Sequence, residues 1–226
     1  MTAAPAGGSS EERGRPGSPR LVLATHNPHK VGELRAILAP VLPGLDPQDV
    51  VGAPEVGGPE AREDGVTFAE NALIKARALA AHTGLPAVAD DSGLCVDVLG
   101  GAPGVFSARW VGRHGDDGAN LSLLLAQLAD VPEPHRGAEF RCAAALVTPD
   151  GLEHVEVGVL RGRLAVAPRG AGGFGYDPVL VPDQQPGRAA GRSLTCAELT
   201  PEEKNAISHR GQAFRALAPL LARTLR

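Results

Sequence analysis

The sequence predicts an α/β fold, because short apolar runs typical of strands alternate with segments of helical apolar periodicity. Residues 20–25 and 85–89 are strand-like runs, whereas residues 67–82 and 117–129 carry apolar side chains at helical spacing. The chain has 226 residues, of which 43% are hydrophobic, enough for one domain of ordinary size or two small ones. Residues 1–19 show no apolar periodicity and predict a disordered N-terminal tail.

Charge and composition exclude several classes of protein. The net charge of −4 and the pI near 6.0 argue against a nucleic-acid-binding surface. No apolar run approaches the roughly 20 residues that a membrane-spanning helix needs, and the N-terminus lacks the apolar region of a signal peptide. The cysteines, Cys95, Cys142 and Cys196, are odd in number and form no CxxC pair, so we expect a reduced, cytoplasmic protein without membrane or nucleic-acid partners.

The first strand leads directly into a helix. Residues 20–25 are followed by His26-Asn27-Pro28-His29-Lys30 and by a helical segment over residues 31–38. Asn27 is a good N-cap and Pro28 suits the first helical position, so free backbone N–H groups and Lys30 would form an anion site. The alternative is an ordinary strand–turn–helix with a surface lysine. A short strand is expected at 49–52.

The second helix, over residues 67–82, opens with a capping box formed by Thr67 and Glu70. Asn71 and Lys75 are four residues apart and therefore share the side that flanks the apolar stripe. Lys75 is either a surface lysine whose stem covers the core or a functional cation.

Lysine is scarce in this chain. Of 22 basic residues only Lys30, Lys75 and Lys204 are lysines, and the rest are arginines. Positions that keep lysine are candidates for a compact point charge, such as one that binds phosphate. Chance placement is the alternative.

The strand at 85–89 is expected to end at Asp90-Asp91-Ser92-Gly93, with a separate strand over 94–99. Two carboxylates at a sheet edge suit a hard cation, and ligands of open α/β sheets lie beyond the carboxyl ends of strands. Aspartate, serine and glycine are also common in solvated turns, which is the alternative.

The second half of the chain predicts a long hairpin, a flexible loop and two helices. Residues 138–148 and 154–166 form the hairpin around a Pro-Asp-Gly turn. Residues 170–175 match GxGxxG, but two prolines follow where the dinucleotide fingerprint needs a helix. The loop therefore suits base stacking and reading through Phe174, Tyr176 and Asp177, or an aromatic tucked into the core.

The last two helices begin at a second capping box, Thr200 to Glu203. The first of them carries Lys204 and Ser208 on one face. Residues 209–211 are expected to interrupt the helical pattern before an amphipathic helix over 212–226. Arg210 in the interruption could fork onto a planar acceptor.

Six ordered motifs together resemble the inosine triphosphate pyrophosphatase family, also known as Ham1 or RdgB-like non-canonical purine nucleotide pyrophosphatases. They are THNPHK at 25–30, TFAENALIKA at 67–76, ADDSG at 89–93, GGAPG at 100–104, GGFGYDP at 172–178 and EEKNAISHRG at 202–211. The resemblance runs from Leu21 to the C-terminal helix. His26 stands where the family often has glycine or another small residue.

The resemblance implies an elongated mixed β-sheet with flanking helices, two lobes around a central cleft, a single domain over 20–226 and a homodimer. It also implies Mg²⁺-dependent hydrolysis of ITP, dITP and XTP to the monophosphate and pyrophosphate. Water would attack the α-phosphorus, with positioning and charge neutralisation supplying much of the catalysis.

The same resemblance assigns roles to residues of this chain. Asp91 would be the general base and a metal ligand, Glu63 would lie near the metal, and Lys75 would be catalytic and hold phosphate. Asp90 would assist or tune Asp91, because close carboxylates push each other's pKa apart. Phe174 would stack on the base. The substrate-binding set is completed by Thr25, His26, Asn27, Pro28, His29, Lys30 and Ser92 around the phosphates, and by Gly175, Tyr176, Asp177, Lys204, His209 and Arg210 around the base.

Base choice follows from donors and acceptors. A 6-oxo purine offers O6 and N7, which an arginine fork such as Arg210 can match, whereas adenine offers an amino donor there. Two rival hypotheses remain open: a pyrophosphatase for modified pyrimidines or canonical nucleotides, and a non-catalytic nucleotide sensor.

Overall fold

The computed structural model describes residues 19–25, 28–40, 42, 44–189 and 191–225. The predicted tail therefore lies almost wholly outside the described residues, as do His26 and Asn27. The helices are α1 (Pro28–Leu38), α2 (Phe68–Thr83), α3 (Asp117–Gln127), α4 (Pro201–Ile207) and α5 (His209–Thr224). The strands are β1 (Leu21–Leu23), β2 (Val50–Gly52), β3 (Ala87–Val96), β4 (Gly137–Val147), β5 (Glu153–Leu164) and β6 (Leu180–Pro182).

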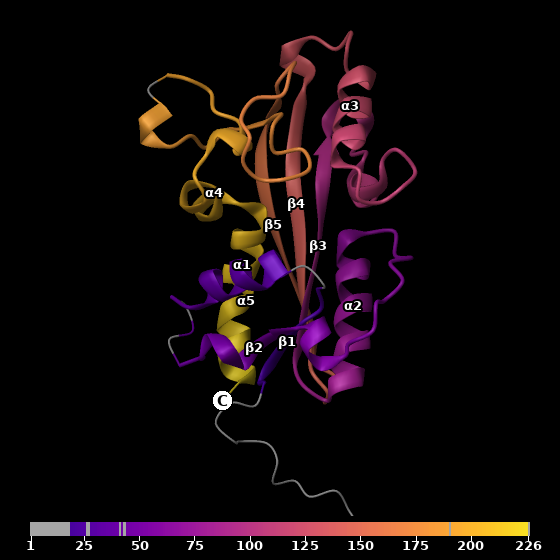
Figure 1. The fold of residues 1–226 in the computed structure, drawn as a ribbon, viewed down its shortest axis with the longest axis vertical. Coiled ribbons are helices and arrows are strands. Elements are labelled where there is room, and N and C mark those ends of the chain that lie inside the picture. The colour runs from indigo at the N-terminus through magenta and orange to yellow at the C-terminus, as the bar shows by residue number, and fades with distance from the viewer. Residues whose placement is uncertain (1–18, 26–27, 41, 43, 190, 226) are drawn as a thin grey trace, which may run out of the picture.

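The strands form one mixed sheet in the order β2-β1-β3-β4-β5-β6. β1 is parallel to both β2 and β3, whereas β3, β4, β5 and β6 pair antiparallel in succession. The long strands β3, β4 and β5 run along the molecule, with α1 and α2 beside one half and α3 and α4 beside the other (Figure 1). This arrangement confirms the expected elongated mixed sheet with flanking helices.

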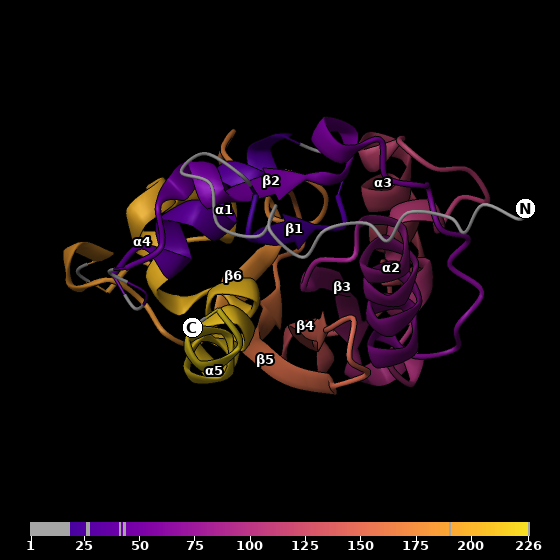
Figure 2. The same ribbon diagram turned by 90° about the horizontal axis from the view of Figure 1, so that it is seen from below.

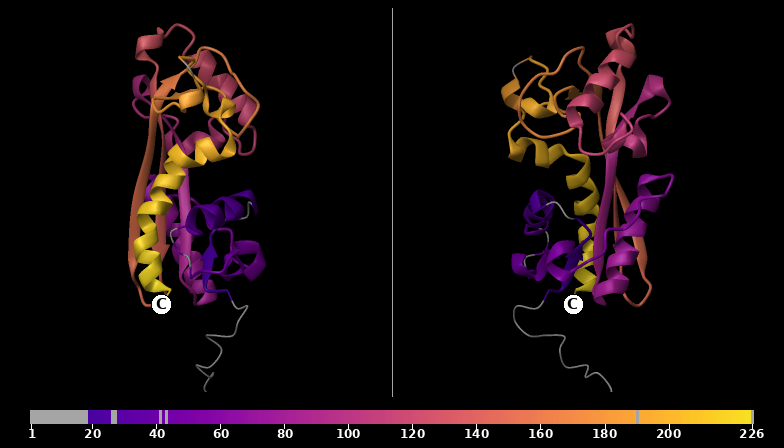
Figure 3. Two further views of the ribbon diagram at one scale, coloured as in Figure 1. Left: turned by 90° about the vertical axis from the view of Figure 1, so that its left-hand side faces the viewer. Right: turned by 45° about the vertical axis from the view of Figure 1, so that its right-hand side comes forward.

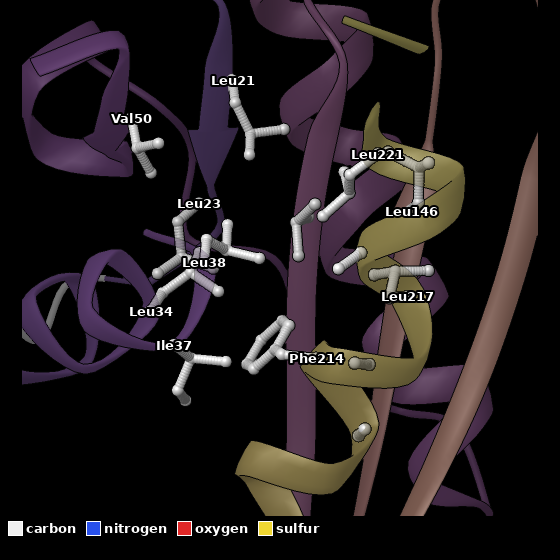
Figure 4. Packing of buried hydrophobic residues seen from close by; sticks show 14 of the residues in the cluster. Leu21, Leu23, Leu34, Ile37, Leu38, Val50, Leu146, Phe214, Leu217 and Leu221 are labelled. Atoms are coloured by element: carbon white, nitrogen blue, oxygen red, sulfur yellow. The ribbon is translucent and has the colours of Figure 1, made fainter. Parts of the chain in front are cut away.

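Helices cover both faces of the sheet (Figures 2 and 3). One core joins α1 and α5 to side chains of β1, β3 and β4, with Phe214 near its centre (Figure 4). A second core joins α2 to the opposite face, against alanines of β3 and β4. A third core packs Leu124 of α3 and Leu128, which follows that helix, with Leu94 and Val96 of β3. In the described part of the chain, no helix is both long and apolar enough to cross a membrane.

Local sequence signals set several element boundaries as expected. Thr67 and Glu70 form the capping box that starts α2, and Thr200 with Glu203 does the same for α4. Pro28 occupies the first position of α1, where its missing N–H costs nothing. The predicted hairpin is present as β4 and β5, and residues 170–175 form no helix.

Two predicted boundaries are wrong. The strand does not end at Ala89: β3 continues through Asp90, Asp91, Ser92 and Gly93 to Val96, paired with β4 throughout. Turn propensity is overridden here because both neighbouring layers supply partners for the polar side chains. The break between the last helices lies at Ser208, which is extended and caps α5, so residues 209–211 form the first turn of α5 instead of interrupting it.

Close packing of α5 on β5 depends on Gly158. A Cβ atom there would lie 2.0 Å from the carbonyl oxygen of His209 and 2.7 Å from the amide nitrogen of Ala213. Both contacts are with helix backbone, which cannot rotate aside as a side chain can. The first turn of α5 therefore approaches the sheet closely because this position lacks a side chain.

We predict that Gly158→Ala lowers the free energy of unfolding by about 1–3 kcal/mol, because the added methyl overpacks this contact. Urea denaturation measures the change. Gly118→Ala is the matched control, because a methyl group at that position would meet no neighbouring atom within 4 Å and alanine favours the α3 helix. A Gly158→Ala variant as stable as the control would contradict the packing account.

Candidate active site

The centre of the site is a pair of adjacent acids inside a strand. Successive side chains of a strand point to opposite faces, so Asp90 and Asp91 of β3 diverge. Asp90 shares its face with α1 and α5, and Asp91 shares the other face with α2. Each carboxylate is thus neutralised by a different layer of the fold.

Asp90 is buried and bound by two cations. Nε and Nη2 of Arg210 each donate to its Oδ2 at 3.1 Å, and Lys30 Nζ lies 3.5 Å from the same oxygen. Burial alone would raise the pKa of Asp90, but the charges of Arg210 and Lys30 outweigh it and hold the pKa well below its usual range. Asp90 is therefore a permanent anion that ties α5 and α1 to the sheet.

Asp91 has weaker partners. Asn71 Nδ2 donates to its Oδ2 at 3.1 Å, and Lys75 Nζ lies 3.5 Å from its Oδ1. Burial raises the pKa of Asp91 more than Lys75 and Asn71 lower it, so the net shift is upward. A carboxylate with a raised pKa is a better proton acceptor near neutral pH.

The predicted tuning of Asp91 by Asp90 is only a minor part of this shift. Burial is the main cause of the raised pKa of Asp91, and the charges of Glu63 and Asp90 add to it to a smaller extent. The physical reason is that the two side chains lie on opposite faces of the sheet and Asp90 is neutralised by its own cations.

Lys75 links Asp91 to Glu63. Its Nζ donates to Glu63 Oε1 at 2.8 Å. Burial would lower the pKa of Lys75, but the carboxylates of Asp91, Asp90 and Glu63 together raise it. Asn71 is fixed in turn, because its Oδ1 accepts from the backbone N–H of Gly65 at 2.9 Å. The segment before α2 thus brings Glu63 to the acid pair.

Glu63 and Asp91 are the carboxylates that a divalent cation could use. Among the described residues no group of three or more His, Cys, Asp or Glu side chains gathers as a complete metal site. Mg²⁺ does not need one, because it commonly uses one or two carboxylates together with water and substrate phosphates. Two oxygen donors beside a large open cavity fit that coordination.

Two adjoining cavities meet over the acid pair, sharing Ser92, Ala108, Phe174 and Arg210 in their walls. One is strongly charged and is lined by Thr25, Lys30, Arg62, Glu63, Lys75, Asp90, Asp91, Arg109 and His114, among others. The other is mainly apolar and aromatic, with Leu94, Phe140, Tyr176 and His209 in its wall. A ligand with one polyanionic end and one flat apolar end would match this pair of cavities.

Phe174 stands between the two cavities. Its side chain is 56% exposed, and Lys204 Nζ lies 4.9 Å from the ring centroid. Asp177 is buried and its Oδ2 accepts from both the Phe174 N–H, at 2.8 Å, and Lys204 Nζ, at 2.5 Å. An exposed aromatic ring on a braced loop is a stacking platform.

His209 presents a neutral ring to the apolar cavity. Burial, with the nearby cations Arg210 and Lys204, lowers the pKa of His209 to about 3. The ring stacks on Phe140 with centroids 5.0 Å apart. Its buried Nδ1 has no hydrogen-bond partner in the part of the chain that the structure describes.

Most of the predicted site residues with described side chains converge here. Lys30, Lys75 and Lys204 each contact a carboxylate in a cavity wall. His26 and Asn27 lie outside the described residues, and for Pro28 and His29 only the backbone of α1 is described. Tyr176 is buried and its hydroxyl donates to the Ser107 carbonyl, so it supports the loop as a core aromatic.

Arg210 lies in the walls of both cavities and binds Asp90. The fork that was expected to match a purine edge has Nε and Nη2 directed at Asp90. Other residues of the site were missed by the sequence analysis, namely Arg62, Arg109, His114 and Asp117 in the cavity walls. Asn71 was placed on the same side of its helix as Lys75 by the sequence analysis but was given no role there.

The chain belongs to the Ham1 family, whose model matches residues 21–220. It is 65% identical over 209 residues to a protein of Streptomyces coelicolor named dITP/XTP pyrophosphatase, covering 91% of this chain and 98% of that protein. A protein of Leifsonia xyli with the same name is 55% identical over 202 residues, covering 89% of this chain and 95% of that protein.

Solved structures agree with this assignment. A crystal structure of a nucleoside-triphosphatase / dITP/XTP pyrophosphatase from Mycobacterium abscessus is 52% identical, with a TM-score of 0.69, covering 89% of this chain and 98% of that one. A HAM1 protein from Coxiella burnetii is 39% identical, with a TM-score of 0.77, covering 91% of this chain and 99% of that one. The sheet and its flanking helices are thus a known architecture of this family.

We predict that Asp90→Asn lowers the free energy of unfolding at pH 7 by about 3–5 kcal/mol, because it leaves the buried Arg210 without its anion. The folded-state pKa of Asp90 is depressed, so its stabilisation is complete above the unfolded pKa of about 3.9 and is lost as the pH falls below it. Urea denaturation at a series of pH values should show a constant deficit between pH 7 and about 5 that narrows below about 4.

Asp91→Asn is the matched control for this measurement. The pKa of Asp91 is raised in the folded state, so its protonation on acidification favours folding. As the pH falls, the unmodified protein should therefore gain free energy of unfolding relative to Asp91→Asn, whereas it loses free energy of unfolding relative to Asp90→Asn. Equal pH dependence in the two variants would contradict the division of roles between the acids.

Proposed function

We propose that this chain hydrolyses non-canonical purine nucleoside triphosphates, namely ITP, dITP and XTP, to the nucleoside monophosphate and pyrophosphate. The observation that carries the proposal is the pair of adjoining cavities, one charged and one aromatic, that meet at Ser92, Phe174 and Arg210. The names of the Streptomyces coelicolor and Leifsonia xyli relatives support the same substrates. Hydrolysis of this kind would remove damaged nucleotides from the pool.

The aromatic cavity is the proposed base site. Phe174 stacks on the purine, and Lys204, beside the ring, donates to the 6-oxo group. The unpartnered Nδ1 of His209 gains a hydrogen bond from the base or from a water that the base orders. Adenine, with a 6-amino donor, would place two donors against each other at Lys204 and is rejected for that reason.

The charged cavity is the proposed triphosphate site. Lys30 and Lys75 neutralise the phosphates as point charges, and Thr25 and Ser92 supply hydroxyl groups at its wall. The residues from His26 to His29 complete the phosphate contacts at the start of α1, where backbone N–H groups favour an anion. Arg210 remains hydrogen-bonded to Asp90 and thereby fixes the wall that the two cavities share.

Asp91 acts as the general base. Its carboxylate takes a proton from a water molecule, whose oxygen forms a bond to the α-phosphorus while the bond from that phosphorus to the bridging oxygen of the β-phosphate breaks. The leaving group is pyrophosphate, and its charge is balanced by Lys75 and Lys30. Asn71 holds Asp91 so that one oxygen faces the cavity.

Mg²⁺ is the proposed cofactor, with Asp91 and Glu63 as its protein ligands. Bound there, it would neutralise the phosphates and polarise the reacting oxygens. Lys75 occupies the space between these two carboxylates in the structure. With a cation held by these carboxylates, the ammonium group of Lys75 would be available to the substrate phosphates.

We also propose that the protein is a homodimer, on the basis of the family resemblance. We propose a cytoplasmic location because Cys95, Cys142 and Cys196 are free. Light scattering on the purified protein tests the dimer, and cell fractionation tests the location. A monomer at micromolar concentration would overturn the dimer.

The proposed activity predicts the outcome of a direct assay with ITP, XTP, GTP and ATP, each with and without Mg²⁺. We expect pyrophosphate release from ITP and XTP only with Mg²⁺, and little from GTP or ATP. Release of orthophosphate would instead indicate that water attacks the γ-phosphorus, and would contradict the proposed mechanism. Hydrolysis confined to pyrimidine or canonical nucleotides, or binding without hydrolysis, would favour the rival enzyme or the sensor.

We predict that Asp91→Asn keeps nucleotide binding but lowers kcat by at least about 100-fold, the usual contribution of a general base. Isothermal titration with ITP in the presence of Mg²⁺ measures binding, and pyrophosphate release measures kcat. Asn71→Ala is the control for positioning and should lose less activity. Near-normal turnover of Asp91→Asn would reject the assignment of the base.

A further inference from the structure

A residue of α3 also holds the loop that carries Phe174. Asp117 is the first residue of α3, and its Oδ2 accepts a hydrogen bond from the backbone N–H of Gly175 at 3.0 Å. Gly175 directly follows Phe174. Asp117 also lines the aromatic cavity.

The backbone around Phe174 relies on glycine and on carboxylate partners, beside the hydrogen bond from the Gly172 N–H to the Ala197 carbonyl at 3.0 Å. Gly170, Gly173 and Gly175 all have positive φ, between 59° and 82°, so the backbone here uses conformations that glycine tolerates best. Within this stretch, the Phe174 and Gly175 N–H groups are both bound by carboxylates, those of Asp177 and Asp117. Tyr176 adds an anchor through the Ser107 carbonyl.

The two carboxylates have different surroundings. Asp177 is buried and is also bound by Lys204, so it belongs to the packed wall of the base site. Asp117 is exposed and its described hydrogen bond goes to the loop backbone. A hydrogen bond from a backbone N–H to a carboxylate is stronger than one between neutral groups. Asp117 can therefore hold the backbone that carries the Phe174 ring.

We propose that Asp117 is a positioning residue that presents Phe174 for stacking on the purine, and that it determines base affinity through this ring alone. The inference rests on the stacking role of Phe174 in the proposed function. Its consequence is specific. Loss of Asp117 should weaken the binding of ligands that contain a base and leave the binding of ligands that contain only phosphates unchanged. A ring held in advance avoids the entropy cost of ordering the loop on binding.

The test is a double-mutant cycle with inosine 5′-monophosphate and pyrophosphate as separate probes of the two cavities, measured as competitive inhibitors or by titration. We expect Asp117→Ala to raise the Kd for inosine 5′-monophosphate about fivefold, the order of one hydrogen bond, and to leave the Kd for pyrophosphate unchanged. In a Phe174→Ala background the same substitution should have almost no effect. Asp117→Asn, which keeps an acceptor oxygen, should restore most of the affinity.

Asp116→Ala is the matched control. Asp116 is the neighbouring acid, but it caps α3 through the Ala119 N–H and pairs with Arg113, so its loss perturbs the helix start without touching the loop. It should leave both dissociation constants unchanged. If Asp116→Ala weakens inosine 5′-monophosphate as much as Asp117→Ala does, the effect is one of α3 stability or local charge, and the positioning role is rejected.

The remaining outcomes separate this inference from the proposed function. One outcome is that Phe174→Ala weakens the binding of inosine 5′-monophosphate while Asp117→Ala raises the Kd by the same factor with and without the Phe174 ring. In that case Asp117 acts independently of the ring, and only the inference fails. If Phe174→Ala is itself without effect on this ligand, stacking fails, and the positioning role falls with it. Weakened pyrophosphate binding in Asp117→Ala would also overturn the inference.

Discussion

The alternation of side chains along β3 is the constraint on which this site depends. Two consecutive acids inside a strand must point to opposite faces, and at Asp90 and Asp91 β3 pairs with β4, whereas its pairing with β1 ends at Val88. Buried charges require partners. The layer of α1 and α5 supplies Lys30 and Arg210 on one face, and α2 supplies Asn71 and Lys75 on the other. The positions of three helices are thereby fixed relative to the chemistry.

Different partners give the same residue type two different properties. Asp90 receives two nitrogens of a guanidinium and a lysine, so its pKa falls far below the usual range, whereas burial raises that of Asp91. A low-pKa carboxylate is a poor base but a durable anchor for α5. A carboxylate with a raised pKa is suited to accept a proton. The pair is therefore one anchor and one candidate base rather than a shared dyad.

The first turn of α5 joins this chemistry to the recognition of a base. Arg210 reaches Asp90 beneath the charged cavity, and the adjacent His209 faces the aromatic cavity and stacks on Phe140. Gly158 lets this turn approach the sheet closely. Across the aromatic cavity, α3 and α4 brace the Phe174 loop through Asp117 and Lys204. The two cavities thus share Ser92, Phe174 and Arg210, while the rest of their walls comes from different parts of the chain.

The sequence by itself determined what local signals can encode: the α/β class, the capping boxes of α2 and α4, the start of α1 at Pro28, and the long hairpin. Only the tertiary structure decided that β3 continues through Asp90 and Asp91, and that Arg210 binds Asp90, 120 residues away in the sequence. Asp-Asp-Ser-Gly has the propensity of a turn, and only cations from separate layers make it tolerable inside a sheet. Propensity and spacing describe neighbours along the chain, whereas burial and ion pairing depend on residues that folding brings together.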